Sequence, residues 1–134
     1  MKTHVLDASA LYRFLSGGPG ADVVGSLFKQ ARHAEKNLLM SVVNWGEVFY
    51  TVMRATGRDR AQQAMAAAEG LPLTIIDADR PLTQQTADVR ASYGLPYADC
   101  FAAALAGKNG IVVTSDVKHF QLVPWLKVRD IAGK

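Results

Sequence analysis

Cysteine is almost absent from this sequence. Its 134 residues include one cysteine, Cys100, which excludes an internal disulfide and a cysteine-based zinc site and suits a reducing compartment. Long apolar runs are absent too: the run at 111–113 is far shorter than the roughly 18 residues that predict a membrane-spanning helix. The first residues, MKTHVLDAS, lack the longer hydrophobic region and the cleavage site of a secretory signal. We therefore expect a globular, cytoplasmic protein with no membrane contact.

Two further kinds of site lack the residues that they require. The three histidines, His4, His33 and His119, show no metal-ligand spacing, and of the three only His119, just beyond Asp116, is a candidate to lie near the substrate. The segment GGPG at 17–20 lacks the Lys and the Ser or Thr of a phosphate-binding loop, so it is expected to be a turn. Cys100 has no partner histidine nearby and is expected to pack in the core. The acidic residues are therefore the main candidates for chemistry.

Short apolar β-type runs alternate with helical patterns along the whole chain. We expect strands at 3–6, 38–40, 73–76, 111–113 and 127–131, and helices at 9–15, 23–33, 41–53, 58–69, 79–94 and 97–106. Ser9 and Asp79 are the expected N-caps of the first and fifth of these helices. The alternation predicts an α/β fold with three α/β/α layers around a parallel sheet of about four to five strands, forming a single domain over residues 1–134.

Four acidic residues stand where a strand ends or a helix begins. Asp7 and Asp116 each follow an apolar strand, in LDAS and VTSD, and Glu47 and Asp99 lie in the first or second turns of helices, in NWGEV and YADC. The carboxyl ends of parallel strands and the N-termini of the following helices meet at one edge of the sheet. The sequence therefore predicts that these four distant acids converge.

Converging carboxylates repel one another, and a divalent cation is the usual way to keep several of them ionised in one cleft. Oxygen ligands favour a hard cation such as Mg²⁺ or Mn²⁺, which also binds substrate phosphates. The chain has 15 Lys and Arg against 12 Asp and Glu, so four acids bound to metal would leave eight against 15 basic residues. A basic exterior around an acidic cleft fits a ligand with a phosphate backbone, although such a charge balance is equally common in domains that only need solubility.

The motifs LDAS, S-x-x-N-W-x-E, Y-A-D-C-F-A-A-A and V-V-T-S-D together resemble a PIN domain over essentially the whole chain. Among PIN domains, the length and spacing are similar to VapC, the toxin ribonucleases of type II toxin–antitoxin pairs. The resemblance implies that Asp7, Glu47, Asp99 and Asp116 are the catalytic, metal-binding acids, with Ser9, Thr114 and Asn44 as polar supports. The sequence departs from the family at Ser115, where many relatives have Gly between Thr and Asp.

The activity that the resemblance implies is endoribonuclease hydrolysis of a single-stranded or loop RNA. Metal-activated water would attack the phosphodiester and leave a 5′-phosphate and a 3′-hydroxyl, with Mg²⁺ as cofactor and Mn²⁺ as a substitute. Asp7, Asp99 and Asp116 are the expected ligands, whereas Glu47 either binds a second ion or orients the water. The RNA target, the number of metals and metal binding without substrate stay open.

The same resemblance implies a homodimer and a cognate VapB-like antitoxin that neutralises the toxin. Arg13, Arg54 and Arg58 are candidate contacts for RNA or antitoxin, or are ordinary surface charges. The antitoxin family stays open.

Three other functions remain in view. One is a PIN nuclease of RNA maturation without an antitoxin, and another is a non-catalytic PIN-fold binding module whose acids only support structure. A phosphatase with Asp7 as nucleophile would expect a second acid two residues later, where this chain has Ser9. Taken singly, Asp7 and Asp99 could be ordinary first-turn acids and Asp116 a turn residue. Glu47 is the least easily explained in this way, because its helix is otherwise largely apolar.

Overall fold

A parallel five-stranded sheet forms the centre of the molecule. The computed structural model describes residues 2–132. The strands are β1 (Lys2–Leu6), β2 (Lys36–Ser41), β3 (Thr74–Ile76), β4 (Ile111–Thr114) and β5 (Lys127–Asp130). They pair in the order β3-β2-β1-β4-β5, and every pairing is parallel. Because β1 is central, the residue that follows it lies at the middle of the carboxyl edge.

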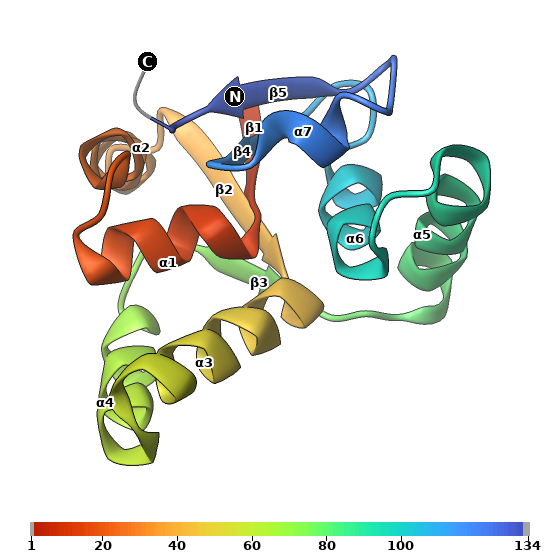
Figure 1. Cartoon of the computed structure of the whole chain (residues 1–134). Coiled ribbons are helices and arrows are strands. Elements are labelled where there is room, and N and C mark those ends of the chain that lie inside the picture. The colour runs from red at the N-terminus through yellow and green to blue at the C-terminus, as the bar shows by residue number, and fades with distance from the viewer. Residues whose placement is uncertain (1, 133–134) are drawn as a thin grey trace.

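Helices cover both faces of the sheet (Figure 1). They are α1 (Ala8–Ser16), α2 (Ala21–Arg32), α3 (Val42–Thr56), α4 (Arg58–Ala68), α5 (Arg80–Tyr93), α6 (Tyr97–Ala106) and the short α7 (Val117–Phe120). The group α1 to α4 covers one face, and α5 and α6 cover the other (Figure 1). The result is the three-layer α/β/α architecture that the sequence predicts.

The alternating direction of side chains along β1 explains why helices cover both faces of the sheet. Leu6 packs into the hydrophobic cluster beneath α1, α2 and α3, whereas its neighbour Val5 packs into the opposite cluster with residues of α6. Successive strand residues point to opposite faces, so a strand that is apolar at both positions needs a layer on each side.

The register of β1 and β4 brings two sequence-distant polar residues together. Leu6 pairs with Val113, and the N–H of Asp7 donates to the carbonyl oxygen of Val113 at 3.2 Å. Asp7 and Thr114, which directly follow this pair, therefore leave the sheet side by side at its carboxyl edge. No helix between residues 2 and 132 is long and apolar enough to span a membrane.

The expected elements are all present, but one cap is wrong. Asp79 caps α5 as predicted, with its Oδ1 accepting from the N–H of Leu82 at 3.0 Å. For α1, the cap is Asp7 and not Ser9: Asp7 has extended backbone and its Oδ1 accepts from the N–H of Ala10. Ser9 lies inside the helix, where its hydroxyl turns back to the capping carboxylate.

Candidate functional site: an acidic pocket at the carboxyl edge of the sheet

Asp7 is a buried carboxylate with a full set of donors. Its side chain is 5% exposed. Oδ1 accepts from Ser9 Oγ at 2.7 Å and from the N–H of Ala10 at 3.0 Å, and Oδ2 accepts from Thr114 Oγ1 at 2.5 Å. Burial is the largest cause of a pKa of about 6 at Asp7; the charge of Asp99 adds to this rise, and the three hydrogen bonds oppose it. The donors hold the carboxylate in one orientation, yet its ionisation is disfavoured.

Ser9 and Thr114 also shape the loop that carries Asp116. The N–H of Ser115 donates to Ser9 Oγ, and the N–H of Asp116 donates to Thr114 Oγ1, both at 2.9 Å. Ser115 has no positive φ, so this loop does not need the glycine that many relatives have there. The two hydroxyls therefore tie Asp7 and the Asp116 loop into one unit.

Asn44 supports Glu47 from one turn earlier on α3. Its Nδ2 donates to Glu47 Oε1 at 2.8 Å and to the carbonyl oxygen of Ala98 at 3.1 Å, while its Oδ1 accepts from Ser41 Oγ at 2.9 Å. Asn44 is fully buried. Burial raises the pKa of Glu47, the hydrogen bond from Asn44 lowers it, and the charge of Asp99 raises it. A single amide thus fixes the carboxylate of α3 and joins it to the first turn of α6.

Asp99 is fixed by a residue that the sequence did not place in the site. His119 Nδ1, on α7, lies 2.8 Å from Asp99 Oδ2 and 4.0 Å from Asp116 Oδ2. Burial raises the pKa of Asp99, His119 lowers it, and the charge of Asp116 raises it. Asp116 itself has a side chain that is 60% exposed, so it lies at the open side of the group.

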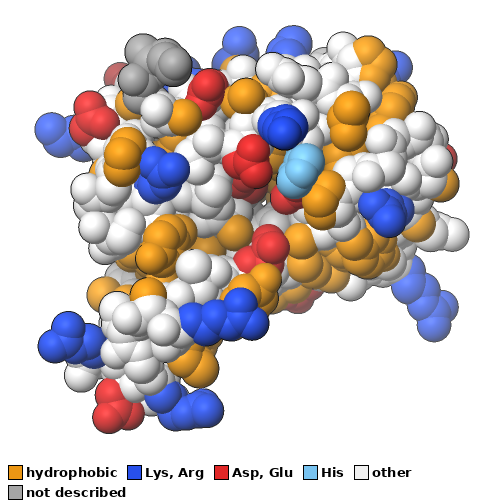
Figure 2. All heavy atoms as spheres, in the orientation of Figure 1, with side chains coloured by type: hydrophobic (Ala, Val, Ile, Leu, Met, Phe, Trp, Pro, Cys, Tyr) orange, Lys and Arg blue, Asp and Glu red, His pale blue; other side chains and the backbone are white. Residues whose placement is uncertain are grey.

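All four acids line one pocket of about 300 Å³, which opens at the carboxyl edge of the sheet. Its walls consist of Asp7, Ala8, Ser9, Tyr12, Glu47, Thr51, Asp99 and Asp116. Figure 2 shows acidic side chains around a hollow near the middle of one face, with a histidine beside them and Lys and Arg further out. The fold thus brings together four acids that are distant in the sequence, of which the first, Asp7, and the last, Asp116, are more than 100 residues apart.

The donors of this pocket fit a hard divalent cation. They are carboxylate oxygens, and in three of the four the pKa is raised both by burial and by a neighbouring acid, which is repulsion that a cation would relieve. Over residues 2–132, no group of three or more His, Cys, Asp and Glu side chains is placed to hold a metal ion by itself. An open arrangement suits Mg²⁺, which keeps several waters and uses few carboxylates.

Two polar residues of the pocket wall, Tyr12 and Thr51, and His119 beside it were not among the predicted site residues. Tyr12 and Thr51 follow pocket residues by one helical turn, at positions i+3 from Ser9 and i+4 from Glu47, and this spacing could have identified them. His119 stands three residues after Asp116, which gives the same signal only if α7 is foreseen. Cys100 is fully buried, in agreement with its expected place in the core.

We predict that Asn44→Ala lowers the free energy of unfolding by about 1 to 3 kcal/mol, because two half-buried acceptors, the carbonyl oxygen of Ala98 and Glu47 Oε1, lose their donor. Urea unfolding monitored by circular dichroism measures the change. Asn37→Ala is the matched control, since Asn37 is exposed and makes a single 3.4 Å hydrogen bond to Thr3. Equal stability of both variants would show that Asn44 does not join α3 to α6.

Comparison with known proteins gives a family match over most of the chain. The PIN domain family model matches residues 4–126. No curated protein sequence matches the chain.

Solved structures share the fold at low sequence identity. VapBC2 of Rickettsia felis bound to a promoter DNA fragment superposes with a TM-score of 0.77 at 18% identity, covering 96% of this chain and 98% of that one. DNA-bound VapBC of Salmonella typhimurium gives a TM-score of 0.76 at 18% identity, with 97% and 98% covered. The Mycobacterium tuberculosis VapC20, a Sarcin-Ricin loop cleaving toxin, gives 0.68 at 14% identity, with 90% and 95% covered. At these identities the likeness establishes the fold.

Proposed function

The chain belongs to the PIN domain family, and from this membership we propose that it is a VapC-like, Mg²⁺-dependent endoribonuclease, the toxin of a toxin–antitoxin pair. The observation that carries the proposal is the convergence of Asp7, Glu47, Asp99 and Asp116 on one pocket. The raised pKa values of Asp7, Glu47 and Asp99 and the oxygen-only donor set support a cation site. The likeness to VapBC complexes and to an RNA-cleaving toxin supports the toxin assignment.

In this proposal Asp7, Asp99 and Asp116 hold the cation, with Mn²⁺ as a possible substitute, and Glu47 either binds a second ion or orients the water. When bound, the cation neutralises charge that develops on the phosphate and promotes ionisation of water. The hydroxyls of Ser9 and Thr114 keep both oxygens of Asp7 in place, and the amide of Asn44 does the same for Glu47. Preorganised groups of this kind need no rearrangement when the substrate arrives.

The substrate of the proposal is single-stranded or loop RNA. The pocket of about 300 Å³ has room for a phosphodiester with its immediate neighbours. Basic residues elsewhere outnumber the acids outside the pocket, because four of the 12 acids line it and the chain has 15 Lys and Arg. This balance favours a polyanion, whose backbone is held by Lys and Arg.

The chemistry is tested by the ends of the cleaved RNA. Fragments from total RNA and Mg²⁺ are ligated to adaptors that require a 5′-phosphate, with and without prior kinase treatment. Direct ligation at unique sites is the expected result, since water attack at phosphorus leaves 5′-phosphate and 3′-hydroxyl ends. Fragments that ligate only after kinase treatment would contradict the proposal, because they indicate attack by the RNA 2′-hydroxyl.

In this proposal the protein acts in the cytoplasm. It binds a cognate VapB-like antitoxin and pairs with a second copy of the chain. We expect the product of a small neighbouring reading frame to co-purify with the protein and to suppress RNA cleavage. Active nuclease without any such inhibitor would instead favour a PIN enzyme of RNA maturation. Failure to cleave RNA under any condition would favour a non-catalytic binding module.

A further inference from the structure

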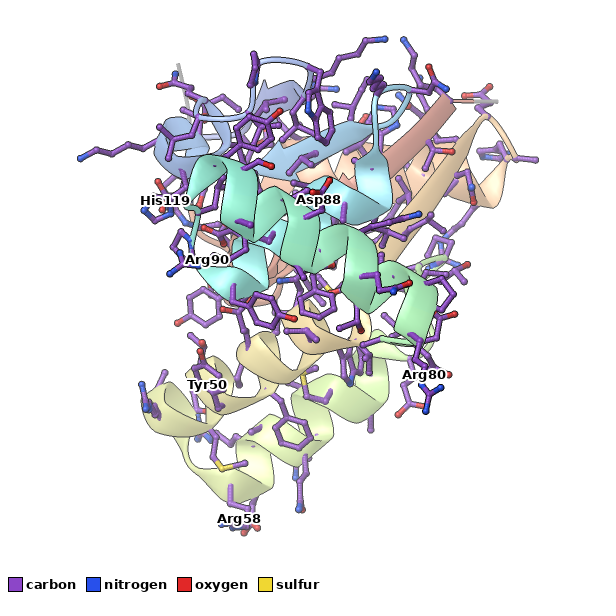
Figure 3. All side chains as sticks on the ribbon, turned by 90° about the vertical axis from the view of Figure 1, so that its right-hand side faces the viewer. Tyr50, Arg58, Arg80, Asp88, Arg90 and His119 are labelled. Carbon is purple, nitrogen blue, oxygen red and sulfur yellow. The ribbon has the colours of Figure 1, made fainter. Side chains whose placement is uncertain are left out.

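His119 forms a contact that joins the last short helix to the acidic pocket. Its Nδ1 lies 2.8 Å from Asp99 Oδ2, and 22% of the Asp99 side chain is exposed. Figure 3 shows His119 along the same edge of the molecule as Arg90 and Tyr50. Among the described residues, both contacts within 4.0 Å between a basic side chain and a carboxylate involve this histidine and an acid of the pocket.

Three of the pocket acids, Asp7, Glu47 and Asp99, share a pattern of support. Asp7 receives hydroxyl donors from Ser9 and Thr114, and Glu47 receives the amide of Asn44. For Asp99, the contact of this kind is His119. Because an ionised carboxylate has no proton to donate, Nδ1 must carry the proton in this pair, and a neutral imidazole then has its free lone pair on Nε2. His119 thus completes a set of side-chain donors around the acids.

We propose that His119 is a positioning residue that orients Asp99 for cation binding through its Nδ1–H. The inference rests on the proposed function, because it needs a cation in the pocket. Ligating carboxylates are commonly held by hydrogen bonds from outer residues, and loss of such a partner typically weakens metal affinity about 10- to 100-fold. His119 also lies near Asp116, so it is suited to set the separation of two acids from different helices.

A purely structural role predicts a different outcome. His119 is on a helix of four residues, so its bond to Asp99 could simply anchor α7 to α6. In that case His119→Ala would lower the melting temperature of the apoprotein and weaken cation binding only as a consequence. A positioning role instead predicts weaker cation binding by His119→Ala at a nearly unchanged melting temperature of the apoprotein. Asparagine tests whether the hydrogen bond alone is enough, since its Nδ2 can take a position close to that of the imidazole Nδ1 and donate the same bond.

The test is calorimetric titration of Mn²⁺ into the full-length wild type, His119→Ala, His119→Asn and His33→Ala, without RNA. His33 is exposed at the end of α2, so its substitution controls for loss of a surface imidazole. We expect His119→Ala to bind Mn²⁺ about 10- to 100-fold more weakly than wild type, with His119→Asn and His33→Ala close to wild type. Melting temperatures in EDTA show that each variant is folded.

Equal Mn²⁺ affinity of His119→Ala and wild type would overturn the inference. So would an Asn variant that binds as weakly as the Ala variant, or a wild type that binds no Mn²⁺. These failures are distinguishable from failure of the proposed nuclease, which is measured separately as cleavage of RNA by the wild type.

Discussion

Replacing Asp7 with Asn is expected to lower RNA cleavage by at least about 100-fold, because loss of an outer partner of a metal site already weakens it about 10- to 100-fold and Asp7 is proposed as a direct ligand. The substitution keeps the size of the side chain and removes its negative charge. The retained Oδ1 can still accept from the N–H of Ala10, so the cap of α1 persists. Initial rates on a labelled RNA that the wild type cleaves measure the effect.

Asp79→Asn is a closely matched control for this substitution. Asp79 caps α5 with the same geometry, since in both caps Oδ1 accepts from the N–H three residues later at 3.0 Å. Asp79 is exposed and is not part of the pocket wall. Unchanged cleavage by Asp79→Asn and lost cleavage by Asp7→Asn would assign the effect to the pocket. A cleavage rate of Asp7→Asn equal to that of the wild type would contradict the role of Asp7.

The same substitution is expected to stabilise the protein in the absence of metal. Burial raises the pKa of Asp7 from 3.8 to about 6, so the folded protein holds its proton more tightly than the unfolded chain. The stability that this group contributes is present below pH 3.8 and is lost as the pH rises through about 6. The loss amounts to about 3 kcal/mol at neutral pH, and asparagine avoids it.

Urea unfolding in EDTA at pH 4.5 and 7.5 measures this effect. The gain in unfolding free energy of Asp7→Asn over wild type should be about 2 kcal/mol larger at pH 7.5 than at pH 4.5. Added Mn²⁺ should then stabilise the wild type and leave Asp7→Asn nearly unchanged, because a ligand stabilises only the state that binds it. An Asp7→Asn variant that is less stable than wild type at both pH values would contradict the conclusion that burial makes the ionised form of Asp7 destabilising.

Much of the fold follows from local patterns in the sequence. The strand around Val5 and Leu6 is apolar at successive positions and requires cover on both faces, and Asp79 before Pro81 predicts the start of α5 correctly. Local reasoning failed at the start of α1, where Asp7 and Ser9 are both good caps. The choice depended on the register of β1 and β4, which places Thr114 next to Asp7 and leaves the hydroxyl of Ser9 free to donate to it.

The site was predictable where topology alone brings residues together. Asp7 and Asp116 follow neighbouring parallel strands, and Glu47 and Asp99 lie in the first two turns of helices that open on the same edge. His119 was expected only to lie near the substrate, and its role as a partner of Asp99 was not foreseen, because α7 has only four residues and too weak a pattern to predict. Its contact with Asp99 depends on how α7 packs against α6, which is a tertiary property that no spacing in the sequence encodes.

The most direct test of the central claim is a time course of labelled total RNA with purified wild-type protein in Mg²⁺, Mn²⁺ or EDTA. Discrete fragments that accumulate with either metal and disappear in EDTA are the predicted result, and Asp7→Asn should produce none of them. Fragments that accumulate equally in EDTA would contradict the claim, because four carboxylates without a cation offer no means of neutralising the charge on the phosphate.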